Sequence, residues 1–269
     1  MTEDNLEMSP PPADARIAYG RDPNQFLDLR LPPAEQQASA RRKDHRPYPL
    51  VINIHGGYWN ALNSLDHAGP LCAALTAKGV ATANLEYRRV GNDGGVWPGP
   101  FTDVCAAYGF LVRNSRRYKL DIERMIVMGH SAGAQLALCL AAHEPEVTLV
   151  VSLAGVVDMR RACQLHLGDD AVVAFLGGTP AEVPGNYREA DPMQLTIPRA
   201  RQWLIHGSAD ELVPPKFSRD YVAAKQNRVD GKKEDVHLFE IPGAGHFDVI
   251  DPNTTAWRSV EQTVLQILT

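Results

Sequence analysis

Short apolar runs recur along the chain, and each is long enough for one buried strand. They lie at residues 50–54, 80–85, 125–128, 147–153, 202–205 and 236–241. An earlier segment, Gln25–Pro32, alternates apolar and polar residues, which is typical of a half-exposed strand. Continuous apolar runs are typical of strands in a parallel sheet that is covered on both faces.

Helix-like segments separate these runs. They lie at residues 65–79, 103–118, 132–142, 216–228 and 254–268. The first has helical apolar spacing and ends at a glycine, and the second is amphipathic. Strands that alternate with helices predict an α/β fold, with a mostly parallel central sheet of about eight strands and helices on both faces.

The domain organisation follows from the segments outside this pattern. Residues 1–15 are acidic and then proline-rich, which predicts an N-terminal arm. Residues 16–269 contain no linker or internal repeat, so we expect a single domain. Within it, residues 159–199 lack a clear strand and are expected to form short helices and loops, a small cap-like insertion beside a pocket.

One stretch combines a strand, a sharp turn and a helix. The apolar run before Gly129 leads into Gly-His-Ser-Ala-Gly, and small helix-forming residues follow it. Glycines at 129 and 133 let a strand and a helix approach closely, and the turn presents Ser131 above the sheet. The N-terminus of the following helix favours an anion at that point. Ser131 is therefore the candidate nucleophile.

Other polar motifs also come directly after predicted strands. They contribute His55-Gly56-Gly57, Arg88, Asp210 and His246. The carboxyl ends of parallel strands meet at one edge of a sheet, where binding sites collect. We therefore expect these residues to gather around Ser131.

A serine nucleophile needs a base to accept its proton. Among nine histidines, His246 is the best candidate, because it lies in a glycine-rich loop after the last strand. His130 is adjacent to Ser131 but is expected to point away from it. His55 and His206 are expected to bond loop backbone instead of transferring protons.

The base needs a carboxylate that orients it, and the reacting carbonyl needs an oxyanion hole. Asp210 is the candidate carboxylate, with Glu211 and Asp158 as alternatives. The oxyanion donors are expected to be three backbone N–H groups. They belong to Gly57, Tyr58 and Ala132.

Aromatic and basic residues near these motifs are candidate substrate contacts. Trp59, Trp97 and Phe247 are expected to line the site, although each suits core packing equally, and packing is favoured for Trp59. Arg88 is a candidate partner for a substrate carboxylate, and a structural ion pair is the favoured alternative.

Composition limits the partners. The 269 residues carry a net charge of -5 and no basic tract, which argues against nucleic acid. No apolar run reaches membrane-spanning length, and no signal sequence precedes the first strand. The four cysteines show no paired or metal-type spacing. We therefore expect a cytoplasmic protein without metal or organic cofactor, and the sequence leaves a homodimer open.

With these residues assembled, the chain resembles the α/β-hydrolase superfamily. The order Ser131, Asp210, His246 is the order that this fold uses, and the resemblance extends from about Phe26 onward. His-Gly-Gly-Tyr-Trp at 55–59 is similar to the His-Gly-Gly-x-Trp motif of kynurenine formamidases and related serine esterases. Hormone-sensitive-lipase-like esterases usually carry a third glycine and then an aromatic, where this chain has Tyr58 and Trp59.

The resemblance implies a serine hydrolase that cleaves small carboxylic esters or aryl formamides through an acyl-enzyme. The alternative is an exopeptidase or amidase, because Leu212-Val213-Pro214 and residues 176–192 also resemble the prolyl-oligopeptidase-like hydrolase domains. A third hypothesis is a non-catalytic binding protein on a hydrolase scaffold. Such proteins usually lack a member of the triad, whereas this chain has all three.

Overall fold

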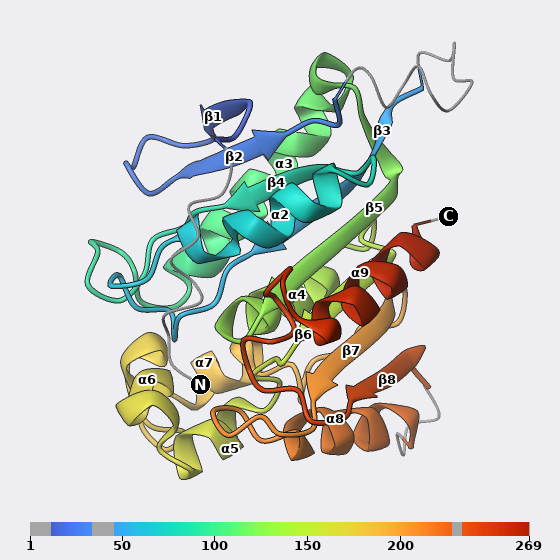
Figure 1. Cartoon of the computed structure of the whole chain (residues 1–269). Coiled ribbons are helices and arrows are strands. Elements are labelled where there is room, and N and C mark those ends of the chain that lie inside the picture. The colour runs from blue at the N-terminus through green and yellow to red at the C-terminus, as the bar shows by residue number, and fades with distance from the viewer. Residues whose placement is uncertain (1–11, 34–45, 228–232, 269) are drawn as a thin grey trace.

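The computed structural model describes residues 12–33, 46–227 and 233–268. Its centre is an eight-stranded sheet in the order β1-β2-β4-β3-β5-β6-β7-β8 (Figure 1). The strands are β1 (Ala15–Ala18), β2 (Phe26–Arg30), β3 (Tyr48–Ile54), β4 (Ala81–Leu85), β5 (Leu120–His130), β6 (Leu149–Leu153), β7 (Arg201–Gly207) and β8 (Val236–Ile241). Only β1 with β2 and β2 with β4 pair antiparallel; the other neighbours are parallel. The predicted fold class is confirmed.

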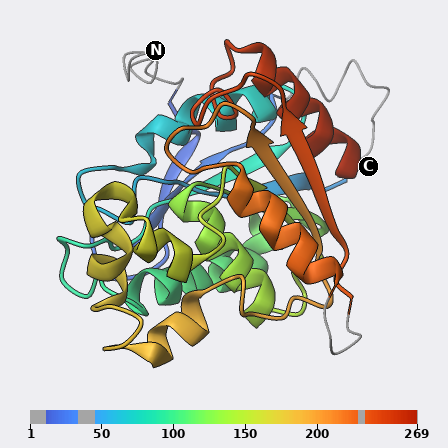
Figure 2. The same ribbon diagram turned by 90° about the horizontal axis from the view of Figure 1, so that it is seen from below.

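Helices cover both faces of this sheet. They are the 3-10 helix η2 (Leu65–Ala68) and the α-helices α2 (Gly69–Thr76), α3 (Gly99–Tyr118), α4 (Ala132–His143), α5 (Met159–Gln164), α6 (Leu167–Leu176), α7 (Pro184–Ala190), α8 (Lys216–Gln226) and α9 (Thr255–Ile267). Figure 2 shows α2 and α9 on one face of the sheet and α3, α4 and α8 on the other.

The central strands contain continuous apolar runs because both of their faces pack against helices. In β5, Met125 and Val127 join the core cluster under α3 and α4. Ile126 and Met128 point the other way and join the cluster under α2 and α9. Successive side chains of a strand alternate between faces, so two cores require an unbroken apolar run.

Two boundaries differ from the sequence prediction. Ala15 begins β1 and pairs with Leu29, although residues 1–15 were expected to form an arm; residues 1–11 lie outside the described residues. β1 carries no apolar run, because its residues alternate between half-buried and exposed. Helix α3 begins at Gly99, earlier than predicted, with Pro100 in its first turn, where a missing N–H costs nothing.

Residues 159–199 contain three short helices, α5, α6 and α7, as expected. They lie together at one end of the sheet in Figure 1. Their contact with the loop after β3 is close, because a Cβ added at Gly168 of α6 would lie 2.5 Å from the Tyr58 ring. The insertion therefore lies beside the loop that follows β3.

Candidate active site

The turn between β5 and α4 has the strained geometry that its sequence predicts. Ser131 adopts φ 54° and ψ −117°. A Cβ at Gly129 would lie 2.2 Å from the Gly133 oxygen, and a Cβ at Gly133 would lie 2.1 Å from the Ile54 oxygen. Both glycines are therefore required by close backbone approach, and the turn meets the end of β3.

Backbone hydrogen bonds hold this strained turn in place. The Ser131 N–H donates to the Leu153 oxygen over 2.8 Å, at the end of β6. The Ser131 oxygen accepts from the N–H groups of Ala134 and Val156, at 3.1 and 3.2 Å. The main chain of Ser131 is thus fixed from neighbouring strand ends, which leaves its hydroxyl free of a structural task.

His246 and Asp210 are hydrogen-bonded to each other. The His246 Nδ1 lies 2.6 Å from Asp210 Oδ2, and both side chains are buried. The other oxygen of Asp210 accepts from the N–H groups of Leu212 and Val213, each at 2.9 Å. Burial opposes ionisation of Asp210, but the hydrogen bonds from His206 and His246 hold the pKa of its carboxyl well below the usual range.

The structure distinguishes Asp210 from its two alternatives by position. Asp158 caps helix α5, where its side chain accepts from the Arg161 N–H at 2.9 Å. Glu211 is exposed to solvent. Of the three carboxylates, Asp210 is the one that contacts His246.

His206 also contacts Asp210, although the sequence analysis expected it to bond only to loop backbone. Its Nε2 lies 2.9 Å from the Val213 oxygen and 3.2 Å from Asp210 Oδ2, and its Nδ1 lies 2.7 Å from Ser218 Oγ. Two acceptors face Nε2, so the proton of a neutral ring belongs there, and Nδ1 accepts from Ser218. His206 therefore supports the carboxylate of Asp210 through the same oxygen, Oδ2, that His246 contacts.

His130 lies against the loop that carries His246. Its Nε2 lies 3.0 Å from the His246 oxygen, and the two rings are 4.6 Å apart between centroids. Burial and the neighbouring His246 lower the pKa of His130 well below its ordinary value. A neutral His130 can donate from Nε2 to that carbonyl, so it helps to hold the loop over the turn at Ser131.

The loop after β3 provides N–H groups without acceptors. Gly57, Tyr58 and Trp59 have φ values of 102°, 53° and 54°, three consecutive left-handed residues. A Cβ at Gly56 would lie 3.1 Å from Ser131 Cβ, so the loop touches the turn. Among the hydrogen bonds of the described residues, none has the N–H of Gly57 or Tyr58 as donor.

The third candidate donor is the N–H of Ala132, directly after Ser131. Ala132 is the first residue of α4, so its N–H has no acceptor within that helix. The three candidate oxyanion donors, Gly57, Tyr58 and Ala132, thus come from the two segments that meet at Gly56 and Ser131.

The aromatic candidates occupy different environments. Trp59 is fully buried, stacks on Phe175 at 4.4 Å between ring centroids and donates to Gln135, so it is a core residue. Trp97 also packs against Phe175, at 5.8 Å between centroids. Phe247 is half-buried, with its ring 5.2 Å from that of His246. Phe247 is therefore the aromatic candidate beside the hydrogen-bonded pair of His246 and Asp210.

Arg88 is held in a two-point ion pair. Its Nε and Nη2 donate to the two oxygens of Asp103, at 2.8 and 2.6 Å, and the Asp103 side chain is fully buried. Forked contacts of this kind are the strong form of the Arg–carboxylate interaction. The geometry supports the structural ion pair for Arg88.

Two histidines with lowered pKa values make the stability of the fold depend on pH. Burial, assisted by the charge of His55, lowers the pKa of His67 to about 4, whereas an unfolded histidine titrates at about 6.5. Between those values the unfolded chain binds the proton and the folded chain does not, so stability falls as the pH falls. His130 acts in the same direction.

We expect the free energy of unfolding to fall by about 1–3 kcal/mol between pH 7 and pH 4.5 through His67. Urea titrations of the wild type and of His67→Asn at both pH values measure this, and the variant should lose less. His237→Asn is the control, because His237 is exposed. An identical loss in the wild type and His67→Asn would contradict the assignment.

Two features are absent from the described part of the chain. No cluster of three or more His, Cys, Asp or Glu side chains there could hold a metal ion. None of the helices in these residues combines the length and apolar character needed to cross a membrane.

A comparison with known families identifies the family of this chain. The sequence profile of the BD-FAE family matches residues 38–224, which is more than half of the chain. The protein therefore belongs to the BD-FAE family.

Curated relatives agree with this placement. Esterase LipC of Mycobacterium tuberculosis is 29% identical over 260 residues, covering 88% of this chain and 60% of that protein. A kynurenine formamidase from Salmo salar is 24% identical over 270 residues, covering 94% of this chain and 81% of that protein. This chain thus spans about 60% of the length of the esterase it matches.

Solved structures share the fold. Esterase B from Lactobacillus rhamnosis superposes with a TM-score of 0.78 at 19% identity, covering 98% of this chain and 90% of that one. A carbohydrate esterase from gut microbiota gives a TM-score of 0.76 at 20% identity, covering 97% and 98%. These matches confirm the predicted α/β-hydrolase fold.

Proposed function

We propose that the protein is a serine hydrolase that cleaves small carboxylic esters or aryl formamides through an acyl-enzyme. The observation that carries the proposal is the 2.6 Å hydrogen bond between Asp210 and His246, on the sheet edge where the strained turn presents Ser131. Esterases and a kynurenine formamidase among the relatives support it.

In the proposed mechanism, Ser131 Oγ attacks the carbonyl carbon and His246 Nε2 takes its proton. Asp210 fixes the proton of His246 on Nδ1 and stabilises the imidazolium that forms. The leaving alcohol or amine then receives the proton from Nε2. Water then attacks the acyl-enzyme with the same proton transfers through His246, which releases the acid and restores Ser131.

The negative oxygen of the tetrahedral intermediate needs donors that are already in place. The N–H groups of Gly57, Tyr58 and Ala132 suit this task, because the structure assigns no acceptor to the first two and the helix start gives none to the third. Losing one such donor typically lowers turnover by about 100- to 1000-fold.

Arg88 bears on the choice between esters and formamides. A kynurenine-type substrate carries a carboxylate, and Asp103 already occupies the Nε–Nη2 fork of Arg88. The ion pair therefore favours esters without a carboxylate. Phe247 is the aromatic residue that we propose for the substrate wall, because its ring borders His246.

The test is a side-by-side comparison of rates on aryl esters, acetate through octanoate, on N-formylkynurenine and on aminoacyl arylamides. We expect at least one ester to be cleaved about tenfold faster than the formamide. Ser131→Ala is the blank. A preference for arylamides would replace the proposal with an amidase, and inactivity on every substrate would overturn it.

A further inference from the structure

The loop that carries the candidate oxyanion donors contains no helix or strand between β3 and η2. Three consecutive residues of its backbone, 57–59, have positive φ values. Residues other than glycine rarely adopt this left-handed conformation. Such a conformation persists only where the surroundings fix it. The groups that fix this loop therefore decide where its N–H groups point.

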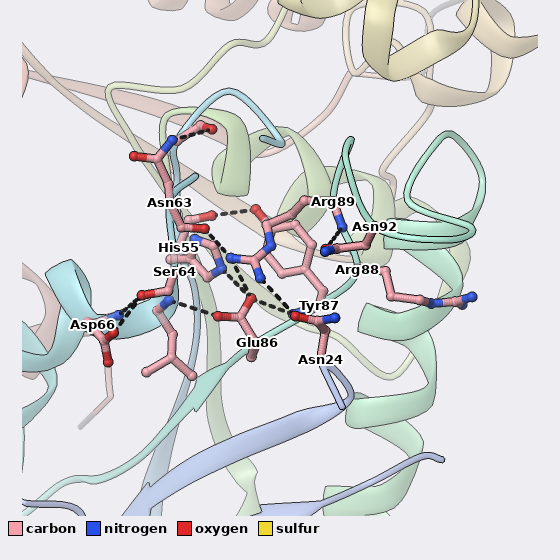
Figure 3. A network of polar contacts seen from close by, with 12 residues as sticks. Asn24, His55, Asn63, Ser64, Asp66, Glu86, Tyr87, Arg88, Arg89 and Asn92 are labelled. Atoms are coloured by element: carbon pink, nitrogen blue, oxygen red, sulfur yellow. Dashed lines mark hydrogen bonds and ion pairs between the residues drawn. The ribbon is translucent and has the colours of Figure 1, made fainter. Parts of the chain in front are cut away.

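One buried carboxylate, that of Glu86, contacts both ends of the loop. Glu86 directly follows β4 and is 2% exposed. Its Oε1 lies 3.0 Å from His55 Nε2 at the start of the loop, and its Oε2 accepts from the Leu65 N–H over 3.0 Å at the end (Figure 3). A single side chain thus joins the two ends of the eleven-residue segment 55–65.

Arg89 extends the same network to residues inside the loop. Its guanidinium lies 3.1 Å from Glu86 Oε1 and donates to the Asn63 oxygen (Figure 3). The Asn63 side chain in turn donates to the Gly57 oxygen over 3.1 Å. A continuous chain of polar contacts therefore runs from Glu86 to the peptide group of Gly57.

The first residue of the loop is held on every side. The His55 ring stacks on Tyr87 at 4.6 Å between centroids, and the Tyr87 hydroxyl donates to the His55 oxygen over 2.8 Å. Burial opposes ionisation of Glu86, but the contacts with His55 and Arg89 lower the pKa of its carboxyl below the ordinary value. The acceptor that faces His55 is therefore a carboxylate at neutral pH.

We propose that Glu86 is a positioning residue for catalysis: by clamping both ends of the 55–65 loop, it aims the N–H groups of Gly57 and Tyr58 at the oxyanion. Glu86 touches no reacting atom and acts through the loop. This inference rests on the proposed hydrolase function. It gives Glu86, which directly follows β4, a role in catalysis outside the catalytic triad.

The test is Glu86→Gln, which keeps the volume and replaces one acceptor oxygen by a donor. Either His55 or Leu65 then loses its acceptor, and Arg89 loses its charge partner. We expect kcat on the best aryl ester to fall about 10- to 100-fold, with KM changed less than about twofold, because misplaced donors weaken the transition state. The inhibition constant of a trifluoromethyl ketone, which forms an oxyanion on Ser131, should rise by the same factor.

Glu234→Gln is the matched control for the loss of a buried carboxylate. The Glu234 side chain is fully buried and lies 3.7 Å from Lys225 Nζ, beyond the amino ends of β7 and β8. It should lower the thermal midpoint and leave kcat and the inhibition constant within about twofold of the wild type. If Glu86→Gln does not fold, Arg89→Lys, which removes the fork that reaches Asn63, should lower kcat in the same direction.

The outcomes distinguish a failure of the positioning role from a failure of the hydrolase function. The positioning role would be overturned if folded Glu86→Gln kept the wild-type kcat and inhibition constant. It would also be overturned if these two quantities changed no more than they do in Glu234→Gln. If Glu86→Gln does not fold, wild-type kcat in Arg89→Lys would overturn it. A wild type as inactive as Ser131→Ala would mean that the hydrolase function itself fails.

Discussion

Replacing Ser131 by alanine is expected to lower kcat by about 10⁴- to 10⁶-fold, because no other hydroxyl is presented at the turn to form the acyl-enzyme. The fold should survive. The hydrogen bonds of Ser131 to Leu153, Ala134 and Val156 all use its main chain, and alanine keeps them. Steady-state hydrolysis of a short aryl ester, together with thermal unfolding, measures both effects.

The residual rate of Ser131→Ala should match a mock preparation. Turnover within about tenfold of the wild type in a folded variant would remove Ser131 from the mechanism. A large fall in the thermal midpoint would instead indicate that the hydroxyl has a structural role.

Replacing Asp210 by asparagine is expected to lower kcat by about 10⁴-fold, the effect of the same change in a Ser-His-Asp triad. Asp210 accepts from His246, His206 and two backbone N–H groups, and all of these are donors. Asparagine presents an NH₂ group to at least one of them. If it faces His246, the imidazole must turn its lone pair to that group and its proton toward Ser131, which is the wrong tautomer for a base.

Glu211→Gln is the control for this substitution. It removes a neighbouring carboxylate that is exposed and has no contact with His246, so its kcat should stay within about twofold of the wild type. The ester assay used for Ser131→Ala compares the two variants. An equal loss of kcat in Glu211→Gln and Asp210→Asn would contradict the assignment of Asp210 as the residue that orients His246.

The sequence predicted most of the fold because the sheet has a helix layer on each face. The buried stretch of a strand such as β5, at residues 125–128, must then be apolar at every position, and such runs stand out. β1 was missed because it pairs only with β2 at the edge of the sheet and buries little. The start of α3 was missed because a proline in a glycine-rich segment reads as a loop, although it also suits the first turn of a helix.

The candidate site was partly predictable for a related reason. Ser131, Asp210 and His246 each follow a strand, so the topology alone brings them to one edge. The supporting contacts depend on side chains that are distant in sequence. His55 and Glu86 are 31 residues apart, and Asp210 and His246 are 36 apart. No spacing rule connects such pairs, so the roles of His206 and Glu86 emerged only from the structure.

The measurement that tests the central claim most directly is covalent trapping of the nucleophile. The protein is treated with diethyl p-nitrophenyl phosphate, and the modified residue is located by peptide mass spectrometry. We expect stoichiometric release of p-nitrophenol, a single diethylphosphoryl group on Ser131, and no labelling of Ser131→Ala. Ester hydrolysis that continues at the wild-type rate without labelling, or a label on another residue with loss of activity, would contradict a mechanism through Ser131.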